Sequence, residues 1–312
     1  MNENEFPLVS VIIPMFNAQD WINGLLVSIL NQTYQNIEIV LVNDGSTDAS
    51  VEIVSMFSQH RAGIELRIVT QRNSGVSEAR NEGVRQAQGD LLAFVDSDDI
   101  WMPEKIERQV AAIVTLEASA VACGYAIFRD LDREVLDVVH PIWSEAGVRN
   151  WLLLRSYGGL LSSTLMLKKE VFYQAGPFRR DLSLSADIEF AWRLLKVTSV
   201  ALIEDPLVGY RLRPNQMHRS ANLLVEESRK MIQIVDILQL PKFKRIFFAN
   251  LNLRLFLYCL QRRELQEGWQ FLIEALKSNY FEAFNTLGRI LLQRFRRKLK
   301  LSERKSFTLA LP

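Results

Sequence analysis

The chain has 312 residues, of which 37 are Lys or Arg and 36 are Asp or Glu, and its formal net charge is +1 at pH 7. This length accommodates one large domain, or a domain with a substantial appendage, and a hydrophobic content of 48% is ordinary for a globular protein. The balanced charge gives no overall support for a nucleic-acid partner, and 2 cysteines cannot build a disulfide framework.

The N-terminal segment has neither the basic region nor the apolar region of a signal peptide. Charged residues interrupt every apolar run before it reaches the length needed to cross a bilayer. The few cysteines suit a reducing compartment, so these features together predict a cytoplasmic protein.

Four apolar segments in the first hundred residues predict strands of a mostly parallel sheet. They are rich in Val, Ile and Leu, as strands covered on both faces require. Amphipathic segments with helical spacing separate them, and this alternation predicts right-handed crossovers and a doubly wound α/β fold. We expect strands over residues 8–14, 37–44, 64–70 and 90–96, and helices over 20–33, 47–60 and 76–88.

Polar residues follow the carboxyl ends of these strands, where sheets of this kind bind ligands. Asn17 and Asp44 lie there, and "DSDD" at 96–99 places three carboxylates in four positions after an apolar run. Such crowded carboxylates repel one another, and a cation or hydrogen-bond donors relieve that repulsion. The alternative is an acidic turn that caps the helix expected near Pro103.

The pattern changes character in the second half of the chain. Further elements are expected over 104–114 (helix), 119–139 (strands), 160–172 (a strand and a short helix) and from about Ala186 (helix). Amphipathic helices follow from residue 221 onward. We therefore expect an α/β domain over residues 1–220 and an α-helical region over residues 221–312.

Five motifs, taken in order, closely resemble those of the family 2 glycosyltransferases, which have a GT-A fold with a Rossmann-like nucleotide-binding core. The resemblance covers roughly residues 7 to 215. It implies an inverting transfer of a sugar from a nucleotide diphosphate sugar to an acceptor hydroxyl. The motifs are "VSVIIPMFN", "VNDGSTD", "NSGVSEARNEG", "VDSDD" and "ADIEFAWRL".

The first three motifs are similar to those that bind the donor nucleotide. Pro14, Phe16 and Asn17 match a loop that borders the nucleotide, and Arg80 matches an arginine near it. Asp44 matches the aspartate that accepts a hydrogen bond from the uracil N–H, and thymine presents the same group. The resemblance thus implies a UDP-sugar, with a dTDP-sugar as the alternative. Each of these residues has an alternative role. Phe16 could pack in the core, Asp44 could form a turn, and Arg80 could be an ordinary charge on a helix surface.

The acidic cluster matches the family's DxD motif, whose carboxylates meet the ribose and a divalent metal that bridges the phosphates. The resemblance implies that Asp98 binds Mn²⁺ or Mg²⁺ and that Asp96 lies toward the ribose or a metal-bound water. Ser97 is assigned to the same donor site, and Asp99 could instead cap the following helix. A hard cation with oxygen ligands stabilises the negative charge that grows on the departing diphosphate.

Asp187 matches the catalytic base of the last motif, which takes the proton from the acceptor hydroxyl. Ala186 stands where family members usually carry Glu, a departure that concerns the geometry of the acceptor site. Capping of the helix is the other role open to Asp187.

Residues 210–220 match a region where the family often places cationic or imidazole groups over the diphosphate. Arg211 and Arg213 could pair with phosphate oxygens through their planar forks. His218 could complete the metal site or contact phosphate, and a surface histidine is the alternative.

The C-terminal segment 288–305 mixes Leu, Ile and Phe with eight basic residues and one acidic residue. This composition suits an interfacial helix on anionic lipid, where a lipid-linked saccharide acceptor would be found. The alternative is a solvated basic helix packed against the catalytic domain. We therefore expect a cytoplasmic protein, either free or peripheral at the inner face of the membrane.

Other functions are less compatible with the motifs. The Gln-x-x-Arg-Trp motif and membrane spans of processive synthases are absent from the sequence, which favours addition of one or a few sugars. A nucleotidyltransferase would need a Gly-rich basic loop after the first strand, and a dehydrogenase would need G-x-G-x-x-G. A degenerate nucleotide-binding or scaffolding module is the non-enzyme alternative, motivated by Ala186. The expected setting is assembly of cell-surface polysaccharide, O-antigen or glycolipid.

Overall fold

The computed structural model describes residues 7–58, 64–129, 135–154, 161–213, 221–262 and 265–300. These residues form two compact units, which we call the sheet unit and the helical unit. Of the described residues, the sheet unit holds 7–145 and 161–213, and the helical unit holds 146–154 and 221–300.

The sheet unit is built on one sheet with the strand order β3-β2-β1-β4-β8-β6-β9-β5, with β7 pairing to β6. The strands from β3 to β4 are parallel, whereas β8 runs antiparallel to both β4 and β6. The predicted α/β fold is thereby confirmed, and the sheet is mixed beyond β4. The strands are β1 (Val9–Met15), β2 (Ile37–Asn43), β3 (Glu65–Thr70), β4 (Leu91–Phe94), β5 (Ile100–Trp101), β6 (Ala120–Arg129), β7 (Val135–Val139), β8 (Leu165–Lys168) and β9 (Ala201–Leu212).

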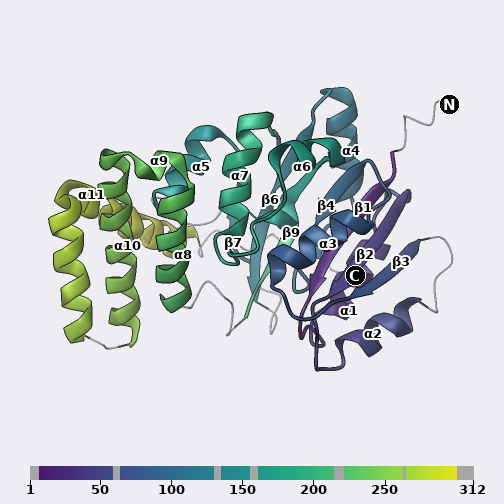
Figure 1. Cartoon of the computed structure of the whole chain (residues 1–312), viewed down its shortest axis with the longest axis horizontal. Helices are drawn as coiled ribbons and strands as arrows, with labels where there is room; N and C mark the ends of the chain where they lie inside the picture. Colours follow the sequence, from purple (N-terminus) through teal and green to yellow (C-terminus); the bar gives the residue numbers. More distant parts are fainter. Residues whose placement is uncertain are drawn as a thin grey trace. The chain divides into compact units, whose positions relative to one another are not determined.

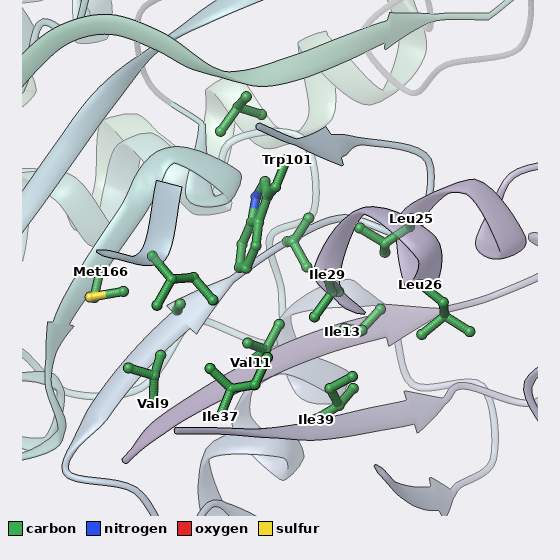
Figure 2. Packing of buried hydrophobic residues seen from close by; sticks show 14 of the residues in the cluster. Val9, Val11, Ile13, Leu25, Leu26, Ile29, Ile37, Ile39, Trp101 and Met166 are labelled. Carbon is green, nitrogen blue, oxygen red and sulfur yellow. The ribbon is translucent and has the colours of Figure 1, made fainter. Parts of the chain in front are cut away.

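Helices cover both faces of the parallel strands, because alternate side chains of each strand point to opposite faces. On one face α3 packs against β1 and β2 (Figure 1), and a Cβ added at Gly83 would overlap the Ile12 side chain. On the other face Val11 and Ile13 of β1 pack against α1, as Figure 2 shows. The helices of this unit are α1 (Ile22–Leu30), α2 (Ser50–Ser58), α3 (Val76–Gln86), α4 (Lys105–Thr115), α6 (Lys169–Ala175) and α7 (Ala186–Val197).

One large apolar cluster holds the sheet unit together. Leu25, Leu26 and Ile29 of α1 recur at helical spacing and meet the side chains of β1 and β2 (Figure 2). Trp101 and Met166 extend the cluster toward the strands beyond β4. The first four strands are thus held in one packed core, and the loops that leave their carboxyl ends start from it.

The helical unit packs around its own smaller cluster, in which Leu253, Ala275 and Ala283 are buried. Asn250 also donates a hydrogen bond of 2.7 Å to the Leu153 carbonyl oxygen. Among the described residues, no helix combines the length and the apolar character needed to cross a membrane. The helices are α5 (Glu145–Leu152), α8 (Ala221–Ile234), α9 (Asp236–Gln239), α10 (Pro241–Arg262) and α11 (Leu265–Lys300).

Three elements were not predicted from the sequence. They are the short strand β5, the helix α5 and the long strand β9. β9 is parallel to β6, and its register shifts around Gly124. β9 ends at Leu212, and Arg211 and Arg213 at this end of the strand lie beside the acidic cluster.

Candidate active site

The loops after β1 and β2 are joined by hydrogen bonds. Asn17 has a positive φ of 48°, and its side-chain Oδ1 accepts a bond of 2.9 Å from the Thr47 amide. The Asp44 amide donates to the Met15 carbonyl oxygen at 2.8 Å. Phe16 is 49% exposed, so its ring does not take the packing role that was the alternative.

Pro14 differs from the expectation. It lies inside β1, in register with Val42, and is buried rather than placed in the following loop. A proline is tolerated there because the pairing of β1 with β4 ends at Ile12, so the ladder on that side requires no N–H from Pro14. Pro14 would therefore affect a nucleotide site by positioning the end of β1, not by lying in the loop that follows it.

Asp44 follows β2 and is only 3% exposed. Its carboxylate accepts hydrogen bonds from the Ser74 amide (2.7 Å), the Gly75 amide (2.9 Å) and the Gln71 side chain (2.8 Å). These three bonds fix the turn that precedes α3, and a turn was the alternative role that the sequence left open for Asp44. A carboxylate offers about four acceptor positions, so three bonds leave capacity for one further donor.

Arg80 of α3 links two carboxylates that lie far apart in the sequence. Its Nη2 donates to Asp96 Oδ1 at 2.7 Å and its Nη1 donates to Asp187 Oδ1 at 2.8 Å. The side chain is 3% exposed and lies 5.2 Å from the centroid of the Phe178 ring. Burial alone would lower the pKa of Arg80, but Asp96 and Asp187 outweigh that effect and raise it. Arg80 is thus a fixed cation between the acidic cluster and the predicted base.

Asp187 lies in the first turn of α7. Its second oxygen, Oδ2, accepts a bond of 3.0 Å from the Ser162 amide. Ser185 occupies the N-cap position of α7 without a side-chain cap bond, so Asp187 is not the cap. Burial raises the pKa of Asp187, and Arg80 opposes that rise. Ala186 is fully buried beside it.

Asp98 is 6% exposed. It contacts Arg211 at the end of β9 and Arg213 just after that strand. Arg213 forms an ion pair with its carboxylate through Nε, and Arg211 Nε donates to its carbonyl oxygen at 2.8 Å. The Arg213 guanidinium also lies 4.5 Å from the centroid of the Trp21 ring. Burial raises the pKa of Asp98 and Arg213 opposes that effect. In this structure both arginines contact Asp98, the residue predicted to bind the metal.

Asp99 connects the cluster to a short helical turn that was not predicted to contribute. Ser163 donates a hydrogen bond to Asp99 Oδ2 at 2.6 Å and accepts one from the Asp96 amide at 3.1 Å. Burial, reinforced by the charges of Asp98 and Asp96, raises the pKa of Asp99 well above its usual value. Since Glu104 occupies the N-cap position of α4, Asp99 does not cap that helix.

The oxygen ligands of the cluster are compatible with a divalent cation. Asp96 and Asp98 are hard ligands, and Mg²⁺ usually takes one or two carboxylates together with substrate phosphates and water. The described residues contain no group of three His, Cys, Asp or Glu side chains placed to hold a metal. Asp99 Oδ1 is buried without a hydrogen-bond partner among the described residues, which shows that the cluster is not fully compensated. Ser97 is partly buried within the cluster, and His218 lies outside the described residues.

Comparison with known proteins finds similarity to one family over part of the chain. Residues 10–160 match the model of "Glycosyl transferase family 2". An uncharacterized glycosyltransferase of Haemophilus influenzae is 39% identical over 133 residues, which are 43% of this chain and 52% of that protein. An uncharacterized glycosyltransferase of Rickettsia typhi is 29% identical over 232 residues, which are 73% of this chain and 71% of the relative.

The fold also resembles a solved structure. S. aureus TarS 1–349, in complex with UDP-GlcNAc, has a TM-score of 0.56 at 17% identity. The match covers 85% of this chain and 90% of the TarS chain. At this level of identity the likeness concerns the fold alone.

Proposed function

We propose that this chain, which is similar to the family 2 glycosyltransferases over residues 10–160, transfers a sugar from a UDP-sugar to an acceptor hydroxyl with inversion. One observation carries the proposal. Arg80 holds Asp96 of the acidic cluster and Asp187 of α7 on one guanidinium, at 2.7 and 2.8 Å. This arrangement supports a base positioned beside the donor, as a single displacement requires.

In the proposed reaction, Asp187 removes the proton from the acceptor hydroxyl. The acceptor oxygen forms a bond to the anomeric carbon while the bond from that carbon to the diphosphate oxygen breaks. The electron pair of the broken bond leaves with UDP. Burial, which raises the pKa of Asp187, makes this carboxylate a stronger base than one in water, and the Ser162 amide fixes its orientation.

The donor site would use the remaining residues of the sheet edge. Asp44 would accept the ring N–H of uracil, and Asn17 and Phe16 would border the nucleotide. Arg211 and Arg213 would face the diphosphate, since both are already delivered to the acidic cluster by β9. A UDP-sugar is favoured because the Asp44 carboxylate suits the uracil N–H, and the fold neighbour TarS was solved in complex with UDP-GlcNAc. A dTDP-sugar is the alternative for the same contact.

Asp98 and Asp96 would hold Mn²⁺ or Mg²⁺, with His218 as a further ligand. When bound, such a cation neutralises negative charge on the diphosphate as a Lewis acid. The protein's own part is to keep these carboxylates in place, and Arg80 and Arg213 do so by ion pairing. We propose a saccharide or a lipid-linked saccharide as the acceptor, in the assembly of a cell-surface polysaccharide, O-antigen or glycolipid.

Calorimetric titration with UDP, dTDP, GDP and CDP tests the donor site, each nucleotide being measured with Mn²⁺ and with EDTA. We expect UDP or dTDP to bind most tightly, and to bind more weakly in EDTA. Asp98→Asn should lose the effect of Mn²⁺. Asp205→Asn, which changes an exposed carboxylate paired to Arg108, should keep it.

Two results would contradict the proposal. If none of the four nucleotides binds, the donor site is absent. If the preferred nucleotide binds equally well with and without Mn²⁺, the role of Asp98 as a metal ligand is wrong. A degenerate module would bind nucleotide yet turn over no donor, which the measurement of turnover described below distinguishes.

A further inference from the structure

The second half of α11 carries aromatic side chains that the helical unit leaves exposed. Tyr280 is 68% exposed, Phe281 is 67% exposed and Phe284 is 64% exposed. Large apolar side chains scattered singly on a surface are common, but three within five positions form a patch. We propose that this patch, together with the basic residues that follow it, binds the surface of an anionic lipid bilayer.

The patch lies at the start of a helix that is distinct from the first half of α11. Asn279 has a non-helical backbone, with φ of −167° and ψ of 95°, and interrupts α11. Its side-chain Oδ1 accepts a hydrogen bond of 3.0 Å from the Glu282 amide, as an N-cap residue does. The helix that begins at Tyr280 and ends at Lys300 therefore has its own cap. At 1.5 Å per residue it is about 30 Å long.

The opposite face of this helix is fixed by the core of the helical unit. Ala283 is buried in the cluster with Leu253, and Thr286 is buried one turn later. Glu282 is 5% exposed, and its carboxylate lies within 3.4 Å of the Asn250 and Thr286 side chains. These contacts set the rotation of the helix about its axis, so its aromatic face cannot turn inward without breaking them.

The sequence of the helix extends both the apolar and the charged character of the patch. The sequence that follows Phe284 also contains Leu and Phe, at positions 291 and 295. Residues 280–300 contain six Arg or Lys and one Glu, a net charge of +5. The whole chain has a net charge of +1, so the rest of it carries −4. The helix that carries the patch thus has a net positive charge, whereas the rest of the chain has a net negative charge.

This charge pattern selects the partner. Anionic headgroups attract a cluster of Lys and Arg, and aromatic side chains suit the boundary between headgroups and acyl chains. A second copy of the chain would bring two helices of charge +5 together, and their repulsion opposes association through this face. The inference does not depend on the proposed transferase reaction.

Vesicle flotation of the full-length protein tests the inference. The vesicles are phosphatidylcholine alone, or phosphatidylcholine mixed with phosphatidylglycerol, each at low and at high salt. We expect flotation with the anionic vesicles, little with the neutral ones, and a decrease at high salt. Phe281→Ser combined with Phe284→Ser should lower the partition coefficient at least about tenfold, because the variant lacks two aromatic side chains that the bilayer would bury.

The matched control is Leu116→Ser combined with Tyr173→Ser, which removes two exposed apolar side chains from the sheet unit. It should float like the wild type, and far-UV circular dichroism should show that both double variants are folded. Wild-type protein that ignores anionic vesicles would overturn the inference, and this result does not depend on any variant. Equal flotation of the aromatic variant would overturn it as well. If sedimentation shows a dimer that the aromatic variant dissociates, the occupant of the patch is a second copy and not lipid.

Discussion

Two cations are buried in the sheet unit, and their surroundings differ. Arg80, on α3 at the carboxyl edge of the strands, is 3% exposed and bonds to Asp96 and Asp187. Lys105, at the start of α4, is fully buried, donates to the Gln109 side chain at 2.7 Å and lies 3.8 Å from the Trp101 ring centroid. Burial lowers the pKa of Lys105 to about 8, whereas the carboxylates raise the pKa of Arg80.

The difference shows what a buried charge does in each region. Burial of either cation costs solvation energy, and only a partner of opposite charge offsets most of that cost. An amide oxygen and an aromatic ring offset less of it. At the edge of the strands the cation also fixes the positions of two carboxylates, which we propose take part in the reaction. At α4 the same cost appears as a loss of stability.

Arg80→Met gives the largest effect expected from this comparison. It leaves Asp96 and Asp187 beside each other without their shared cation, and we expect a loss of about 3–5 kcal/mol in the free energy of unfolding. Urea denaturation at pH 7 measures this loss. Arg108→Met, which breaks the exposed pair with Asp205, should change stability by less than about 1 kcal/mol. A loss as small for Arg80→Met would show that the ion pairs of Arg80 do not offset the cost of its burial.

Lys105→Met tests the cost of burying Lys105 through the pH dependence of the free energy of unfolding. The folded pKa of about 8 lies below the ordinary value of 10.5, so the unfolded state binds more protons between these pH values. The stability of the wild type should therefore rise with pH in that window, and Lys105→Met should lack this rise. Between pH 7 and pH 10.5, we expect the free energy of unfolding of the wild type to rise by about 3 kcal/mol relative to that of Lys105→Met.

The exposed Lys277 offers a control for this measurement, since its side chain is 67% exposed. Lys277→Met should follow the wild type across the same pH range. Because the readout is a change with pH, it is separate from the hydrogen bond that Gln109 loses in Lys105→Met. A difference that stays constant with pH would show that Lys105 is not desolvated in the folded protein.

Much of the fold could be predicted because local patterns carry it. The four parallel strands and their helices follow from apolar runs and helical spacing, and the order of the motifs indicated the GT-A fold. β9 was missed because Pro206 and two acidic residues interrupt its apolar pattern. Its pairing with β6, not its own sequence, makes it a strand. Local propensity cannot predict such a strand.

The site was predictable by residue type but not by partner. The sequence singled out Asp96, Asp98 and Asp187 as carboxylates with a function. It could not predict that Arg80 joins two of them, because Asp187 lies 107 positions away in the chain. Ser163 was missed as well, since a serine at the start of an apolar strand resembles an ordinary turn residue. Contacts of this kind depend on tertiary structure and leave little periodic signal in the sequence.

We propose that Asp187 is the base beside the donor. Its role is tested by measuring the release of UDP from a panel of UDP-sugars, with and without saccharide acceptors. We predict that the wild type turns over at least one donor. Asp187→Asn should keep the affinity for UDP while turnover falls by about 100-fold or more. Asp181→Asn, an exposed carboxylate paired to Arg179, serves as the control and should retain full turnover. Unchanged turnover in Asp187→Asn would contradict the account, and a wild type that binds UDP but turns over no donor would favour the degenerate module.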